Sequence, residues 1–163
     1  NTVGNLLNRT SSMARRWFDD AVPPPTTASQ GSHCLAQQAQ QALESYTAAM
    51  DQLAFREAAE AALNLAIAAN GFLNEQAPWS RIKQGDQTVQ VADDLYAVLE
   101  ATRHVALLLA PLVPALSERM LAQFPPLGSA NWSAHLAWGL LPAEAPLPEP
   151  SPVMARLELE GDL

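Results

Sequence analysis

Apolar residues recur at helical spacing along most of this sequence, and prolines separate the periodic stretches. Proline cannot continue a helix, so each proline cluster ends one helix before the next begins. Aromatic residues make up only 6% of the chain, and β-branched residues form no alternating run, so strands are not expected. The pattern predicts an all-α fold, a helical bundle of about five main helices.

The expected helices follow from the apolar spacing and from the positions of the breaks. They cover residues 1–20, 32–52, 54–76, 88–110 and 114–124, with a short helix that starts at Pro78 and a short apolar element over residues 132–138. Ser32 is expected to cap the second helix, because a serine hydroxyl can accept a bond from a free amide of the first turn.

The chain has enough apolar sequence for one core. Its 163 residues are 48% hydrophobic, which supports a single domain of this size. Five prolines between Pro142 and Pro152 indicate an extended segment that can run along a surface. We expect a helical domain over residues 1–141 and an extended Pro-rich C-terminal tail over residues 142–163. The first apolar stripe is already under way at Asn1, so a fragment of a longer protein is expected.

Composition limits the possible partners and setting. No apolar run is long enough to span a bilayer, so no membrane partner is expected. The single cysteine, Cys34, gives neither an internal disulfide nor a metal-ligand spacing, which favours a cytoplasmic protein without a metal. A net charge of −8 opposes general attraction to nucleic acid. Any contact with RNA must therefore be local.

No residue of the chain is predicted to be catalytic. His33–Cys34 is the only adjacent pair that could hold a nucleophile and a base, but neighbours on a helix point away from each other. His104 and His135 lie in apolar surroundings and are expected to be hydrogen-bonded core or surface histidines. Asp93–Asp94 is expected to be a solvated helix face.

Two groups of polar residues are candidates for binding. Asn5 and Arg9 lie at i and i+4, so their side chains share one face of the first helix. They could form an ordinary polar face. They could equally read the edges of unpaired bases, because arginine offers a planar fork and asparagine a paired donor and acceptor. The residues alone leave both interpretations open.

The second group surrounds Trp79. This tryptophan follows Pro78 at the start of a short helix, where it could be buried against the bundle. It could instead be a stacking platform for an unpaired base, with Arg81 and Lys83 neutralising nearby phosphates. The cations close behind the aromatic ring favour the second interpretation modestly.

Several motifs, in this order and at these separations, resemble the C-terminal anticodon-binding domain of bacterial methionyl-tRNA synthetases. The resemblance begins with Gly4-Asn5-Leu6-Leu7-Asn8-Arg9-Thr10, the proline break after Asp20, the helix from Phe55-Arg56-Glu57-Ala58 to Asn70, and Ala77-Pro78-Trp79. It continues through residues 109–114, 138–142 and 150–156 and so covers nearly the whole chain.

The resemblance implies recognition of the CAU anticodon of methionine tRNA. It assigns the reading of the anticodon to Asn5, Arg9 and Trp79, at a corner shaped by Pro78. Arg16, Arg81 and Lys83 would then hold the sugar-phosphate backbone. The chain departs from the family at Asn74, where an acidic residue is common, and Glu75 could supply that charge. This departure puts the rejection of wrong tRNAs in doubt.

The resemblance also implies what lies outside the chain. The parent enzyme is a methionine-tRNA ligase that uses ATP with magnesium and carries a zinc-bearing insertion. Those signatures are not in this sequence, so the fragment is expected to hold no cofactor and to pair with the catalytic domain of the same polypeptide. Two alternatives stay open. A helical protein-interaction module would bury Trp79, and the anticodon domain of another class I synthetase would prefer another loop.

Overall fold

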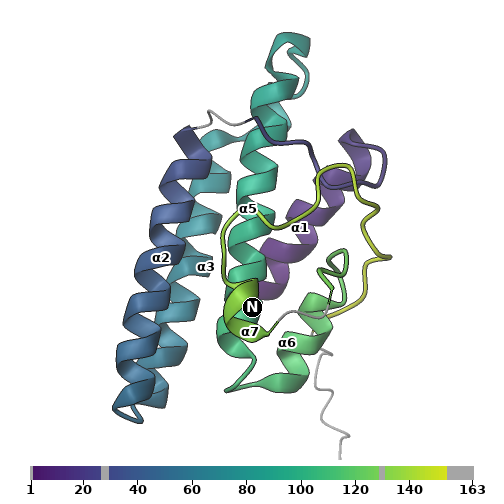
Figure 1. The fold of residues 1–163 in the computed structure, drawn as a ribbon. Coiled ribbons are helices and arrows are strands. Elements are labelled where there is room, and N and C mark those ends of the chain that lie inside the picture. The colour runs from purple at the N-terminus through teal and green to yellow at the C-terminus, as the bar shows by residue number, and fades with distance from the viewer. Residues whose placement is uncertain (1, 27–29, 129–130, 154–163) are drawn as a thin grey trace, which may run out of the picture.

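The computed structural model describes residues 2–26, 30–128 and 131–153, and these ranges form a helical bundle (Figure 1). The predicted all-α class is confirmed, because the described ranges contain one isolated bridge, between Ala21 and Pro146, and no named strand. The elements are α1 (Thr2–Trp17), α2 (Gln30–Asp51), α3 (Phe55–Gln76), α4 (Pro78–Arg81), the 3-10 turn η1 (Gly85–Gln87), α5 (Thr88–Leu109), α6 (Pro114–Leu121) and α7 (Trp132–His135).

Helix α5 is the centre of the bundle. Every residue from Val91 to Leu109 is buried, and α5 contacts α1, α2, α3, α4 and α6 (Figure 1). A helix that is apolar on most of its circumference is stable only when other elements cover it on all sides. Apolar spacing along one helix indicates a single buried face, whereas α5 is buried on all sides from Val91 onward.

Helices α2 and α3 form an antiparallel pair beside α5 (Figure 1). The buried face of α3 is made mostly of alanine, whose small side chain lets neighbouring helices approach closely. Its buried residues are Ala58, Ala61, Ala62, Leu65, Ala66, Ala69 and Leu73. Leu53 connects the two helices in the left-handed backbone region, with φ 57°.

Some predicted helix limits were wrong. Helix α1 ends at Trp17, because Asp19 and Asp20 turn the chain with φ values of 51° and 58°. Helix α2 already begins at Gln30, so Ser32 lies within the helix and does not cap it. Helix α6 stops at Leu121, and the apolar element after residue 131 is helical only over Trp132–His135.

The described part of the Pro-rich segment, residues 142–153, returns along the bundle. The amide of Val22 donates to the carbonyl of Ala145 at 2.9 Å, and the amide of Leu147 donates to the carbonyl of Asp20 at 2.8 Å. Arg15 also donates to the carbonyl of Leu147, at 3.0 Å. Because the side chain of Leu147 is buried, this segment contributes to the core next to the end of α1.

Asp93 and Asp94 are buried in α5, so the predicted solvated face was wrong. Asp93 accepts bonds from the amide and hydroxyl of Thr26, which ties the segment before α2 to the central helix. Asp94 accepts from Arg81 at 2.7 Å and from Gln90 at 3.2 Å. Buried carboxylates need such partners, and the spacing along one helix does not show which distant segments will supply them.

A polar cluster attaches the segment after α7 to α5. The Glu100 carboxylate accepts hydrogen bonds from the guanidinium of Arg103 and from the backbone amides of Gly139 and Leu140, at 2.6 to 3.0 Å. His104 was expected to be a hydrogen-bonded histidine of the core or the surface, and it lies in the core. Its ring nitrogens lie 2.9 Å from the carbonyl oxygens of Glu100 and Leu136. Burial, and then the charge of Arg103, lower the pKa of His104.

Candidate nucleic-acid interface

The first helix presents a polar stripe to solvent. Asn5, Arg9 and Arg16 are exposed on α1, and their spacing places them within about 40° of one another around the helix axis. The opposite side of α1 is apolar and buried against α3 and α5, through residues such as Leu6 and Leu7. The amphipathic pattern of α1 therefore directs the predicted binding residues outward.

Arg9 and Trp79 contact each other across two elements. The guanidinium carbon of Arg9 lies 5.6 Å from the centre of the Trp79 ring, within the range of a cation–π contact. The same guanidinium donates to the side-chain oxygens of Asn70 at 3.3 Å and Asn74 at 3.1 Å. Both acceptors are neutral amides, so these bonds orient Arg9 and leave its positive charge uncompensated.

The position of Trp79 depends on a sharp corner between α3 and α4. Ala77 ends α3 in the left-handed region, with φ 43° and ψ 57°, and its amide donates to the carbonyl of Leu73. Pro78 then starts α4 at the first helical position, where its missing amide costs no hydrogen bond, and its ring is buried. Trp79, the next residue, keeps 39% of its surface exposed.

A left-handed backbone is unusual for alanine. This conformation costs an L-residue roughly 1–2 kcal/mol, and such strain persists where the surrounding structure holds it in place. The corner formed by Ala77, Pro78 and Trp79 joins α3 to α4, and α4 contacts α5. The indole is therefore presented to solvent by a backbone geometry that packing must maintain.

Arg81 has partners within the protein rather than a free guanidinium. It forms an ion pair with Asp94 at 2.7 Å and donates to Gln87 at 2.7 Å and Gln76 at 3.1 Å. Its side chain is 21% exposed. The phosphate contact expected of Arg81 would have to compete with these bonds, whereas Lys83 and Glu75 are exposed and can face a ligand.

Most of the predicted binding residues near Trp79 lie together, whereas Asn5 lies apart from them. Arg9, Asn74 and Trp79 form one cluster. Asn5 lies one turn before Arg9 and lines a separate hollow of about 480 Å³, together with Asn8 and Gln123. Residues 150–153 form the other wall of this hollow. The predicted site is thus an elongated strip along α1 that begins beside the tail and ends at Trp79.

Sequence reasoning missed Asn70 and Gln123. Asn70 stands four residues before Asn74 on α3, a spacing that would have placed both amides on the same face. Gln123 donates to the carbonyl of Ser151 at 2.7 Å, which holds the tail against the hollow. No local pattern indicates that contact, because it joins residues 28 positions apart in the sequence.

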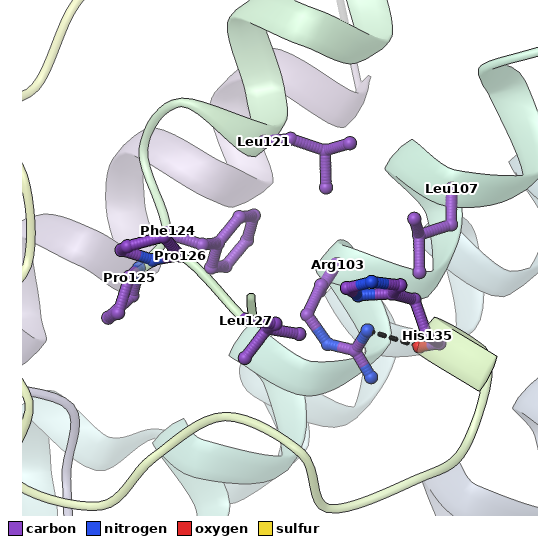
Figure 2. Close-up of a pocket in the computed structure, with 8 residues that line it drawn as sticks. All are labelled: Arg103, Leu107, Leu121, Phe124, Pro125, Pro126, Leu127 and His135. Atoms are coloured by element: carbon purple, nitrogen blue, oxygen red, sulfur yellow. Dashed lines mark hydrogen bonds between the residues drawn. The ribbon is translucent and has the colours of Figure 1, made fainter. Parts of the chain in front are cut away.

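A second cavity, of about 260 Å³, lies between α5, α6 and the loop that follows α6 (Figure 2). Figure 2 shows apolar side chains such as Leu107, Leu121 and Phe124 around this space. The Arg103 guanidinium at its edge donates to the carbonyl of His135. None of the predicted binding residues lines this cavity.

The strip on α1 and α4 offers recognition rather than reaction chemistry. It combines a partly exposed indole, a guanidinium and amide groups, which together can stack on a flat ring and bond to its edge. Among the described residues there is no group of three or more His, Cys, Asp or Glu that could hold a metal ion. In the same residues, no helix is both long and apolar enough to cross a membrane.

The sequence matches the family model described as the anticodon binding domain of methionyl tRNA ligase, over residues 22–158. The matched range includes Trp79 but begins after Asn5 and Arg9. A methionine–tRNA ligase of Thermosynechococcus vestitus is 42% identical over 171 residues, which cover 98% of this chain and 32% of that protein. The chloroplastic/mitochondrial methionine–tRNA ligase of Arabidopsis thaliana is 32% identical, over 99% of this chain and 27% of its own length.

Solved structures agree with these sequence matches. The free form of Mycobacterium tuberculosis methionyl-tRNA synthetase superposes with a TM-score of 0.84 and 29% identity, over 98% of this chain and 32% of that one. The same enzyme bound to methionyl-adenylate superposes with a TM-score of 0.77 over 94% of this chain. The chain therefore spans between about a quarter and a third of the length of these relatives.

Proposed function

Because this chain belongs to the family of anticodon-binding domains of methionyl tRNA ligases, we propose that it binds the anticodon loop of methionine tRNA. The binding residues are Asn5, Arg9, Pro78 and Trp79. The observation that carries the proposal is the contact of the Arg9 guanidinium with the partly exposed indole of Trp79. A base splayed out of the loop stacks on this indole, while Arg9 and Asn5 bond to exposed base edges.

Positive side chains close to the site explain how a chain with a negative net charge can bind RNA. The net charge of −8 gives no general attraction to RNA, so the uncompensated charge of Arg9 must act at short range. Arg16, exposed on the same face of α1, and Lys83, exposed after α4, contact the sugar-phosphate backbone on either side. Arg81 is not included among these contacts, because its guanidinium is bonded within the protein.

Asn74 and Glu75 contribute to discrimination between loops. Asn74 bonds to Arg9 as a neutral acceptor, so it orients the guanidinium without cancelling its charge. The exposed carboxylate of Glu75 lies next to it in the sequence and repels the phosphates of a loop that is seated incorrectly.

The longer protein attaches methionine to this tRNA with ATP and magnesium, and its catalytic domain, with any zinc, lies outside the present chain. We propose a domain division at residue 141, with the tail of residues 142–163 packing on the bundle or on the catalytic domain. The described contacts of Ala145 and Leu147 with the end of α1 support the first of these surfaces. The proposed compartment is the cytoplasm.

The decisive test is titration of a fluorescent stem-loop that carries CAU, beside one with an altered anticodon, at one salt concentration. The wild-type chain prefers CAU, and Trp79→Ala weakens that binding by about 5- to 150-fold, the value of one base–aromatic stack. Phe55→Ala is the matched control, because Phe55 is an exposed aromatic residue at the other end of α3, about 30 Å away.

Each possible outcome of this titration has a distinct meaning. Loss of CAU preference in Trp79→Ala, with Phe55→Ala unchanged, supports the anticodon site. Preference for a different anticodon indicates the domain of another class I synthetase. Equal weak binding of every loop by a folded wild-type chain leaves the helical protein-interaction module, although that alternative predicted a buried Trp79.

A further inference from the structure

We propose that Arg81 and Asp94 form a clamp that positions Trp79 for base stacking, and that Arg81 makes no contact with RNA phosphate. This proposal rests on the proposed function and deepens it. It names two positioning residues for the anticodon site, one of them buried in the central helix. Neither is required to touch the RNA.

The clamp joins the three elements that surround the Trp79 corner. From α4, the Arg81 guanidinium reaches Gln76 at the end of α3, Gln87 just before α5, and Asp94 within α5. Trp79 lies only two residues before Arg81 on the same four-residue helix. A helix of one turn has little rigidity of its own, so the direction of its indole depends on what holds the turn in place.

The corner also needs an external constraint. Ala77 occupies a left-handed conformation that an alanine adopts only when its surroundings impose it. The Arg81–Asp94 bond connects the far end of α4 to a buried group of α5, since the Asp94 side chain is only 1% exposed. With Pro78 buried at the start of α4 and Arg81 bonded at its end, both ends of the turn are attached to the bundle.

The Arg81–Asp94 ion pair contributes more to the geometry of the corner than to the stability of the fold. Burial raises the pKa of the Asp94 carboxyl, although the bonds from Gln90 and Arg81 act to lower it. Bringing these charges out of water therefore opposes much of their attraction, as is common for buried pairs. What the pair supplies is one defined arrangement, because a planar guanidinium bonds three separate acceptors at once.

The two roles of Arg81 predict opposite effects of Asp94→Asn. If Arg81 bound phosphate, the Asp94 carboxylate would compete for it, and its neutralisation would strengthen RNA binding. If Arg81 and Asp94 form a clamp, neutralisation loosens the corner and weakens binding. Asp93→Asn is the matched control, because it removes the same charge from the neighbouring buried residue, whose partner is Thr26 rather than Arg81.

The experiment measures binding of the CAU stem-loop by wild type, Asp94→Asn, Asp93→Asn and Arg81→Gln at several salt concentrations. We expect Asp94→Asn to bind the stem-loop about tenfold more weakly than Asp93→Asn does. This loss is smaller than the largest loss expected when the Trp79 ring is removed, because a loosened corner weakens base stacking without abolishing it. Arg81→Gln should weaken binding without changing the salt dependence, whereas loss of one phosphate contact lowers that slope by about 0.7. Tighter binding by Asp94→Asn, or a reduced slope in Arg81→Gln, would overturn the clamp.

A second measurement does not depend on RNA. The chain contains four tryptophans, so fluorotryptophan labelling gives a small set of ¹⁹F signals, and Trp79→Phe assigns the signal of interest. The clamp predicts that Asp94→Asn shifts or broadens the Trp79 signal and that Asp93→Asn does not. An unchanged Trp79 signal in folded Asp94→Asn contradicts the clamp. A wild-type chain without CAU preference contradicts the proposed function instead, and the ¹⁹F result still decides the clamp.

Discussion

Arg9 is oriented by an aromatic ring and two amide oxygens, at distances that a planar guanidinium can satisfy together. Lysine would keep the positive charge but not the fork or the flat face. At the residue scale, this distinction separates a contact that depends on shape from one that depends only on charge. Arg9 is expected to belong to the first kind and Arg16 to the second.

Arg9→Lys should therefore weaken binding of the CAU stem-loop by about tenfold, since a cation–π contact and its fixed bonds are lost. Titration under constant salt measures the change. Arg16→Lys is the matched control on the same exposed face and should change the affinity by less than about twofold, because a point charge still attracts phosphate. Equal losses in the two variants would show that Arg9 contributes charge alone.

His104 gives the bundle a dependence on pH. Its pKa in the folded state is lowered, so between that value and about 6.5 the unfolded chain binds more protons than the folded chain. Stability supplied by the neutral imidazole is present above about pH 6.5 and is lost as the pH falls. The slope from one such group cannot exceed about 1.4 kcal/mol per pH unit.

Urea unfolding at pH 7.5 and pH 5.5 tests this expectation. The free energy of unfolding should fall less between these pH values in His104→Gln than in the wild type. His33→Gln, which changes an exposed histidine of α2, is the matched control for loss of a histidine outside the core. If His104→Gln loses as much stability on acidification as the wild type, the buried imidazole is not the cause.

At the scale of elements, the turn between α2 and α3 carries avoidable strain. Leu53 has φ 57° and is 72% exposed, so its side chain gains little from burial. Its amide and that of Ala54 donate to carbonyls near the end of α2, a pattern that glycine or asparagine usually completes. The sequence therefore places a poorly suited residue at a position that needs a left-handed backbone.

Leu53→Gly should raise the free energy of unfolding by about 0.5–1 kcal/mol, because relief of the left-handed conformation exceeds the added entropy of the unfolded chain. Urea denaturation at constant pH measures the change. Leu63→Gly is the contrasting control, since Leu63 is exposed within α3 and glycine inside a helix should lower stability by about 1 kcal/mol. Destabilisation by both substitutions would refute the proposed strain.

At the scale of the whole molecule, the Pro-rich segment closes the bundle beside the first helix. The contacts of Leu147 with Asp20 and Arg15 join residues far apart in the sequence. Tyr96 in α5 also donates to the carbonyl of Leu141, at 2.9 Å. This arrangement predicts that residues 142–153 unfold together with the helices rather than independently.

Leu147→Ala should therefore lower the free energy of unfolding of the entire bundle by about 2–5 kcal/mol, the usual cost of removing a buried leucine side chain. Helical circular dichroism during urea unfolding reports the bundle rather than the tail. Glu149→Ala, an exposed change two residues later, should have little effect. A wild-type unfolding curve for Leu147→Ala would mean that the tail and the bundle are not coupled.

The helices and the chemistry of the exposed strip follow from the order of the amino acids. Apolar spacing and proline breaks are local properties, so the class and most of the helix limits could be predicted. The placement of Asn5 and Arg9 on one face of α1 follows from helical periodicity alone. The resemblance then joined this face to Trp79, and the structure places Arg9 against the indole.

Which polar residues are buried, and what they contact, depends on how the helices pack together. Asp93 and Asp94 suggested a solvated face, yet other elements cover α5 on all sides and supply Thr26 and Arg81 as partners. Arg81 was likewise expected to face solvent and bind phosphate, but its guanidinium is bonded to Asp94 inside the protein. Burial depends on elements that are distant in sequence and meet only in the packed bundle, whereas periodicity along one helix records only its own faces.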